Sequence, residues 1–239
     1  MAVTQYSNPF EPDGSAETIN QALNAQAITD INANNELVVM LIYYTDFVAD
    51  ETRLNTPSTT GGFVNMDGGQ IHLSEASGTS NDPLIGVTYT DGTNSTHYAD
   101  TSGNFDDTFY RCGPTSGDLI DLRNEEDADG VATAGINGII GNYKVFTSRY
   151  LGRISMRFPT DASKTASSGF ISLKFLASTS GFFQTDWHGD PLYVCKMSGY
   201  GSEITGVDDF SHIEGWASSG SYAAADTILY NATFFGTNF

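Results

Sequence analysis

The chain has 239 residues, of which 39% are hydrophobic and 12% aromatic, so it is long and apolar enough to fold around a core and is not a disordered chain. Its 29 acidic residues against 10 basic residues leave a net charge of -19. That balance excludes the pervasive basic surface that nucleic-acid binding needs.

The N-terminal region, residues 1–35, is predicted to be an extended arm followed by one short helix. The helix is expected within the stretch SAETINQALNAQAITDI, with Ser15 as its N-cap. Apolar residues recur there at every fourth position: Ile19, Leu23, Ala27 and Ile31. Asn34 and Asn35 are expected to end the helix.

The next stretch, Glu36–Val48, predicts a strand that is covered on both faces. It is apolar at successive positions rather than at alternate ones, and it is rich in β-branched and aromatic residues. It is too short to span a bilayer.

Residues 52–130 are richer in Gly, Ser, Thr, Asn and Asp, and they contain short strand patterns. Turn signals such as Asp67-Gly68-Gly69 and Asp91-Gly92 separate these patterns. We expect an all-β fold in which residues 36–51 and 131–239 form the main barrel or sandwich. Residues 52–130 would form a second, smaller and more polar β unit inserted into it.

Two pentapeptides in the second half are near-copies, Ile154–Phe158 (ISMRF) and Ile171–Phe175 (ISLKF). Each alternates apolar residues with Ser and a basic residue, which predicts a strand with one apolar face. Antiparallel pairing of the two copies is favoured, because parallel pairing would place Arg157 opposite Lys174. The connection between them is long for a hairpin, so strands separated within a sheet are the alternative.

Six of the ten basic residues lie between Lys144 and Lys174, where Asp161 is the only acidic residue. We expect this cluster to form a positive patch that contacts an acidic neighbour or an anionic membrane. Neutralisation by carboxylates of the same chain is the alternative. The candidate interface residues are Arg149, Arg153, Arg157, Lys164 and Lys174.

Residue patterns for catalysis and metal binding are weak, so we expect no enzymatic activity, no metal and no cofactor. The sequence has no nucleophile elbow, phosphate-binding Gly loop or His-Glu-x-x-His motif. Three groups could bind a metal but fit turns or solvated loops better. They are Asp186, His188 and Asp190; Asp208, Asp209 and His212; and the acidic loop Glu125, Glu126, Asp127 and Asp129.

The two cysteines, Cys112 and Cys195, lack metal-ligand spacing. They could form a disulfide with each other, form one with a partner chain, or remain thiols. The first residues show no basic segment followed by an apolar one, so we expect synthesis in a host cytoplasm without a secretory signal.

Taken together, the arm, the short helix, the doubly covered strand, the polar inserted unit and the acid-rich, Lys-poor composition resemble one family of structural proteins. It comprises the major capsid proteins of the single vertical jelly-roll type, found in internal-membrane icosahedral viruses of salt-loving archaea. The resemblance implies an upright jelly-roll barrel whose inserted unit forms a tower. It also implies a capsid subunit located in the virion.

The implied partners are other copies of the chain, a second capsid protein and the internal membrane surface, with no direct nucleic-acid contact. Acid-rich composition itself suits concentrated salt, where repulsion between carboxylates is screened. The alternative function is a glycan- or receptor-binding β-sandwich, as in a spike, tail or lectin, and a glycosidase ranks below it.

Overall fold

The fold is known from a computed structural model, in which most described residues belong to antiparallel β-sheets. The structure describes residues 3–12, 16–47, 64–74, 79–101, 107–115, 123, 127–132, 137–146, 148–177, 183–184, 190–197, 210 and 213. The all-β class that the sequence predicts is therefore confirmed.

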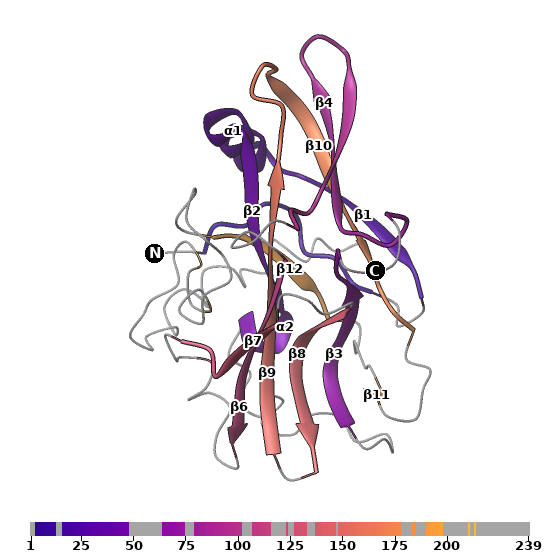
Figure 1. The fold of residues 1–239 in the computed structure, drawn as a ribbon, viewed down its shortest axis with the longest axis vertical. Helices are drawn as coiled ribbons and strands as arrows, with labels where there is room; N and C mark the ends of the chain where they lie inside the picture. Colours follow the sequence, from indigo (N-terminus) through magenta and orange to yellow (C-terminus); the bar gives the residue numbers. More distant parts are fainter. Residues whose placement is uncertain are drawn as a thin grey trace, which may run out of the picture.

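The described strands form a smaller and a larger sheet (Figure 1). The smaller sheet has the order β1 (Thr18–Ala22), β10 (Ala166–Lys174), β4 (Leu84–Tyr89), β5 (Asn94–Tyr98). The larger sheet has the order β11 (Phe183–Gln184), β3 (Val64–His72), β8 (Asn137–Val145), β9 (Ser148–Pro159), β2 (Glu36–Tyr43), β12 (Leu192–Lys196). β6 (Thr108–Thr115) pairs with β9, and β7 (Gly130–Ala132) pairs with β6.

The long strand β9 organises the larger sheet. Its first half pairs with β8 and its second half with β2, while β6 pairs along residues from both halves. In Figure 1, β9 runs along the long axis, from the hairpin with β8 at the lower end to the connection with β10 at the upper end. That connection carries the chain from one sheet to the other.

A hydrophobic core fills the space between the two sheets, and a second core lies on the other face of the larger sheet. β2 belongs to both, because Leu37, Val39 and Leu41 lie in the first core and Val38 and Met40 in the second. All eight of its residues are buried. The predicted strand with two covered faces is confirmed, although Tyr44–Phe47 forms a short helix, α2, rather than its end.

The N-terminal helix starts later than the sequence predicts. Thr18–Ala22 is the edge strand β1, paired with β10, and the helix α1 spans Ala25–Asn34. Asn24 caps it by accepting a hydrogen bond from the Ala27 N–H at 3.0 Å, while Ser15 lies outside the described residues. The start at Ser15 was wrong because pairing with β10 overrides the helical spacing of the apolar residues. The end at Asn35 is confirmed by its left-handed φ of 60°.

The prediction that the near-copies pair with each other is wrong. Ile154–Phe158 lies in β9 of the larger sheet, and most of Ile171–Phe175 lies in β10 of the smaller one. Their apolar side chains nevertheless point inward, as the alternation predicts, and meet in the core between the sheets. The two copies therefore share a core but are not hydrogen-bonded to each other. The alternation of apolar and polar residues determines which face of a strand is buried, but it does not determine the strand with which it pairs.

The separate inserted unit at residues 52–130 is also wrong for the part that the structure describes. Its strands divide between the sheets: β3, β6 and β7 belong to the larger one, β4 and β5 to the smaller one. Gly68, expected in a turn, lies inside β3 opposite Gly141 of β8. Both glycines have a positive φ, and a Cβ on either would meet a backbone oxygen at 2.1 Å. The Asp91-Gly92 turn between β4 and β5 is confirmed.

Candidate interaction site

The candidate interface residues do not gather into one patch. The structure places one of them inside the protein and distributes the others from the β8–β9 hairpin to the end of β10. The contacts of each residue within its own chain decide which of them remain available to a partner.

Arg153 is fully buried, so its expected place on an interaction surface is wrong. Its guanidinium donates two hydrogen bonds to the carboxylate of Asp46, at 2.7 and 2.8 Å, and a third to the Phe210 carbonyl at 2.7 Å. Arg123, also buried, donates to the Asp46 and Phe47 carbonyls. Buried charges need such partners, and Arg153 therefore joins β9, α2 and the C-terminal region.

Arg157 is partly buried and forms ion pairs within its own chain. Its guanidinium lies 2.5 Å from the Glu36 carboxylate and 3.1 Å from that of Asp100. The expectation that acidic partners are scarce around the basic cluster is wrong here, because these acids come from distant parts of the sequence. The alternative of neutralisation within the chain is thus confirmed for Arg157.

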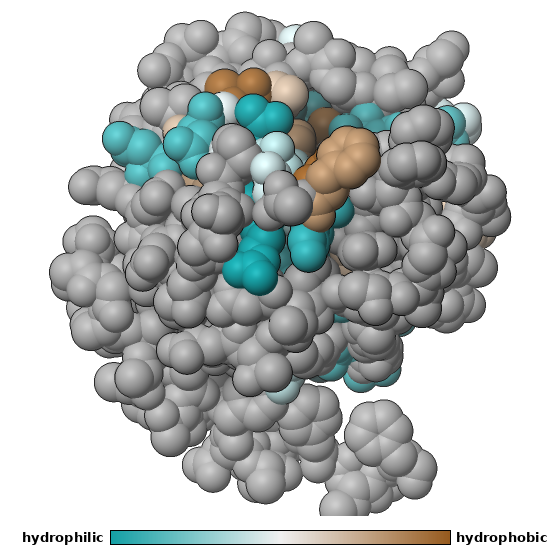
Figure 2. All heavy atoms as spheres, turned by 90° about the horizontal axis from the view of Figure 1, so that it is seen from below, coloured by the Kyte–Doolittle hydropathy of each residue, from teal (hydrophilic) through white to brown (hydrophobic). Residues whose placement is uncertain are grey.

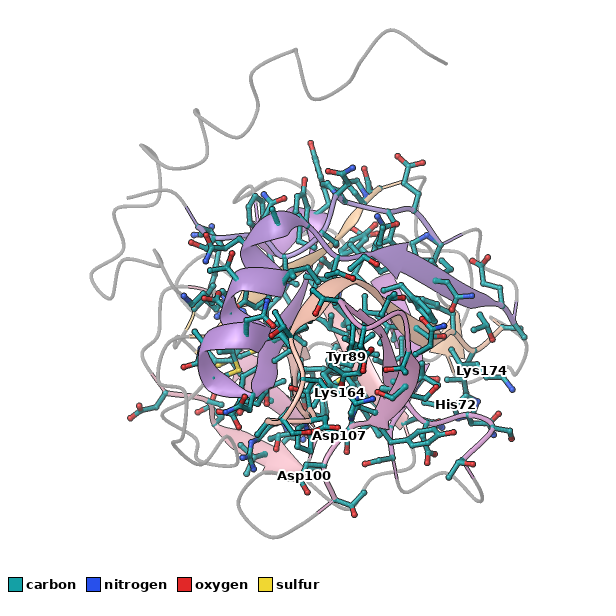
Figure 3. All side chains as sticks on the ribbon, turned by 90° about the horizontal axis from the view of Figure 1, so that it is seen from above. His72, Tyr89, Asp100, Asp107, Lys164 and Lys174 are labelled. Carbon is teal, nitrogen blue, oxygen red and sulfur yellow. The ribbon has the colours of Figure 1, made fainter. Side chains whose placement is uncertain are left out.

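Lys164 lies in the connection between β9 and β10, where it also has partners of its own chain. Its ammonium donates to the Thr93 hydroxyl at 2.8 Å, lies 3.5 Å from the Asp91 carboxylate, and is 5.2 Å from the centre of the Tyr89 ring. Hydrogen bonds from the hydroxyl and backbone of Thr93, with a smaller contribution from Lys164, hold the pKa of Asp91 below its usual value. Figure 3 shows Lys164 beside Tyr89.

Lys174 ends β10 and lies at the margin of the molecule in Figure 3. Its ammonium donates to the side-chain oxygen of Asn81. A neutral partner leaves its charge uncompensated by that contact, so Lys174 suits an interface better than Arg157 does. Its interface role stays a prediction.

Arg149 lies near the start of β9, directly opposite Lys144 of β8. Both side chains are partly exposed. The exposed residue Phe146 occupies the hairpin between them. The interface role of Arg149 also stays a prediction, and the neighbouring Phe146 is a feature that the charge pattern did not reveal.

The two cysteines are buried thiols, and no disulfide joins them. Cys112 lies opposite Leu151 of β9, and Cys195 lies opposite Met40 of β2. β9 and β2 lie between the two strands that carry the cysteines. Three inter-strand spacings of about 4.8 Å therefore separate these strands, which is a distance of about 14 Å. A disulfide requires Cα atoms within about 7 Å. Burial raises the pKa of Cys195, which keeps it a thiol.

Most of the weak metal candidates lie outside the described residues, including Asp186, His188, Asp208, Asp209 and His212, and Glu125 and Glu126 of the acidic loop. Within the described part of the chain, no three His, Cys, Asp or Glu side chains are grouped so as to hold a metal ion. Asp129 instead accepts a hydrogen bond from the Gly113 N–H at 2.6 Å.

A groove of about 270 Å³ lies on the outer face of the smaller sheet. Its lining is uncharged: Gly86, Val87, Thr88, Asn94, Ser95, Thr96 and Phe170. Phe170 is 39% exposed, and its ring covers Gly86, where a Cβ would meet it at 2.3 Å. Sequence reasoning missed this site, although the alternation in β10 places Phe170 on the outward face with Ser172 and Lys174.

Among the described helices, none combines the length and the apolar character that crossing a membrane requires. No protein-family model, no curated protein and no solved structure matches the chain.

Proposed function

We propose that the chain is a structural subunit without catalytic activity, which assembles with further copies into the shell of a virion. The observation that carries the proposal is the pair of cores on the two faces of the larger sheet. A sheet packed on both sides is a rigid block, and rigidity is the property that a shell subunit needs. The acid-rich composition and the order of the segments in the sequence are the reason to assign this subunit to one class, the capsid proteins of the upright jelly-roll type.

Assembly would depend on apolar contact, with charge setting orientation and register. The chain has a net charge of -19, so copies repel one another in dilute salt. Concentrated salt shortens the Debye length to about 3 Å at 1 M and removes that barrier. The proposed partners are other copies, a second capsid protein and the internal membrane of the virion.

Sedimentation and electron microscopy of the purified chain between about 0.1 M and about 2 M KCl test the proposal. We expect a dispersed species in dilute salt and regular, symmetric assemblies in concentrated salt. A folded monomer at every salt concentration, with and without protein from lysed virus particles, would contradict it. Circular dichroism in each sample distinguishes a failure to assemble from a failure to fold.

A glycan-binding function is the second candidate, and the groove on the smaller sheet is the observation that favours it. A pyranose ring has one apolar face and a rim of hydroxyls, which matches an exposed Phe170 ring flanked by Thr88, Asn94 and Thr96. Binding of the full chain to an array of neutral oligosaccharides tests it. Loss of that binding in Asn94→Ala, with the same melting temperature, would support the groove. Unchanged binding would exclude it and leave Phe170 as a cover for Gly86.

A further inference from the structure

A second groove, on the larger sheet, combines a cation, an apolar lining and the edge of a strand. Its volume is about 140 Å³, and its lining consists of Phe109, Arg111, Gly130, Val131 and Ala132. These residues belong to β6 and β7, which lie on the side of β9 away from β8 (Figure 1). The three features together define the chemistry of a ligand.

The cation of this groove is Arg111, an exposed residue. Its guanidinium lies 5.5 Å from the centre of the Tyr150 ring, and that ring stacks on Tyr143 at 4.9 Å. No ion pair between described residues includes Arg111. Asp129, which precedes β7, accepts a hydrogen bond from the Gly113 N–H instead. A guanidinium whose flat face rests on a ring keeps its N–H edge for a planar anion, so Arg111 is positioned to bind a carboxylate.

Three residues supply the apolar lining: Phe109, Val131 and Ala132. Phe109 is partly buried and packs on the core between the sheets, which fixes one wall of the groove. Val131 is 37% exposed, and Ala132 is exposed as well. Figure 2, which views the molecule from the lower end, shows apolar side chains next to hydrophilic ones on the surface that the described residues form. A volume of about 140 Å³ accommodates one small ring or one branched apolar side chain.

The strand β7 is an edge of the larger sheet in the part of the chain that the structure describes, because it pairs with β6 alone. Its residues, Gly130–Ala132, include no charge and no proline, which are features that commonly protect an edge. In antiparallel pairing, alternate residues direct their N–H and C=O groups away from the partner strand. β7 can therefore hydrogen-bond one added strand, and its short length suits the end of a chain.

We propose that this groove binds the C-terminal end of an extended peptide whose last residue is apolar. The terminal carboxylate binds the Arg111 guanidinium, the last side chain fills the space between Phe109 and Val131, and the preceding residues pair with β7. A groove of this size holds one side chain, so a single residue must carry both the charge and the apolar group. A C-terminal apolar residue does so, whereas an internal Asp or Glu has its carboxylate in place of the apolar group.

The net charge of -19 does not prevent the binding of an anionic chain end. The Debye length is about 8 Å at physiological salt, so distant carboxylates act weakly on the ligand while Arg111 contacts it directly. The inference goes beyond the shell proposal, because a monomer provides every residue of the site. Sedimentation tests assembly, and peptide binding tests this site, so either can fail without the other.

Fluorescence anisotropy of the full chain with a labelled peptide tests the proposal at about 0.15 M KCl. The probe is Gly-Ser-Thr-Val-Thr-Leu, with a fluorophore at its N-terminus and a carboxylate at its C-terminus. We expect a dissociation constant below about 1 mM. The C-terminal amide of the same peptide should bind at least about tenfold more weakly, because it loses the charged hydrogen bonds to the guanidinium. N-acetyl-leucine should compete at least about tenfold more weakly than the unlabelled peptide, because it cannot pair with β7.

Pairing with β7 is tested separately with two peptides, each methylated at one of two neighbouring backbone nitrogens. Only alternate N–H groups of an added strand face β7. One methylated peptide should therefore bind at least about tenfold more weakly, and the other should bind as the parent peptide does. Equal binding by both peptides at the parent level would contradict strand pairing.

Four variants of the chain complete the experiment. Arg111→Gln should weaken binding at least about tenfold, whereas Arg111→Lys should weaken it only about threefold, because lysine keeps the charge without the planar fork. Val131→Thr keeps the shape of the side chain but reduces its apolar surface, and it should weaken binding about threefold. Lys174→Gln is the control, because it removes the same charge from the smaller sheet, and it should leave binding unchanged.

Absence of peptide binding by the parent chain, or equal binding of the peptide and its amide, would overturn the proposal. Full binding by Arg111→Gln with an unchanged circular dichroism spectrum would do so as well. An equal loss in Lys174→Gln would show that net charge, and not this groove, governs binding. If N-acetyl-leucine binds as tightly as the peptide, the ligand is a small carboxylic acid and the proposed peptide partner is wrong.

Discussion

The strands β9 and β10 carry nearly the same pentapeptide but have different surroundings. In both strands the apolar residues face the core between the sheets. The other face of β9 lies under the second core, so Arg153 and Ser155 are fully buried there. The other face of β10 forms the outer surface of the smaller sheet, where Phe170 and Lys174 are partly exposed. An alternating pattern thus specifies one buried face and leaves the environment of the other to the rest of the fold.

The largest expected effect concerns the face that the two strands share. Phe158→Ala and Phe175→Ala each remove a fully buried ring from the same core. Each should lower the free energy of unfolding by about 4–5 kcal/mol. Urea unfolding measures both changes, and a difference of more than about 2 kcal/mol between them would show that the two inward faces are not equivalent.

The second effect is specific to the covered face of β9. Arg153→Met removes the guanidinium that binds the buried Asp46 carboxylate and should cost about 3–4 kcal/mol. Arg111→Met, which affects an exposed guanidinium on the adjacent strand β6, is the control and should cost less than about 1 kcal/mol. Equal effects in urea unfolding would argue against a buried ion cluster.

The third comparison uses the basic residues at the same position of the two copies. Arg157→Gln should cost about 1–2 kcal/mol in dilute buffer, because it breaks partly buried contacts with Glu36 and Asp100. Lys174→Gln should change stability by less than about 0.5 kcal/mol. Repeating the unfolding in about 2 M KCl should shrink the Arg157 effect. An effect that does not depend on salt would contradict the ion pairs.

The smallest effect concerns the serines of the two copies. The Ser155 hydroxyl lies 2.9 Å from that of Tyr110 in a fully buried position. Ser155→Ala should cost about 1 kcal/mol, whereas Ser172→Ala should be close to neutral. Thermal unfolding resolves a difference of this size as a few degrees. Ser172 is also buried, at 7% exposure, so the reverse order would mean that its hydroxyl makes the stronger hydrogen bond of the two.

The candidate interaction site was harder to predict from the sequence than the fold was. The clustering of basic residues in the sequence suggested one patch, but β9 and β10 diverge into different sheets and separate its members. Arg149 was named for its charge alone. Phe146 was not recognised, because its exposure and its positive φ follow from its place between the paired strands β8 and β9. A phenylalanine between two basic residues could have been the signal.

The sequence alone determined the all-β class, the doubly covered strand at Glu36–Tyr43, the inward faces of β9 and β10, and the acidic character of the chain. These features follow from local composition and from the two-residue period of a strand. Only the tertiary structure decided which strands pair, that residues 52–130 contribute to both sheets, and that Arg153 is buried while Lys174 is not. Pairing and burial depend on contacts between residues far apart in the sequence, as between Arg153 and Asp46, and no local pattern records such contacts.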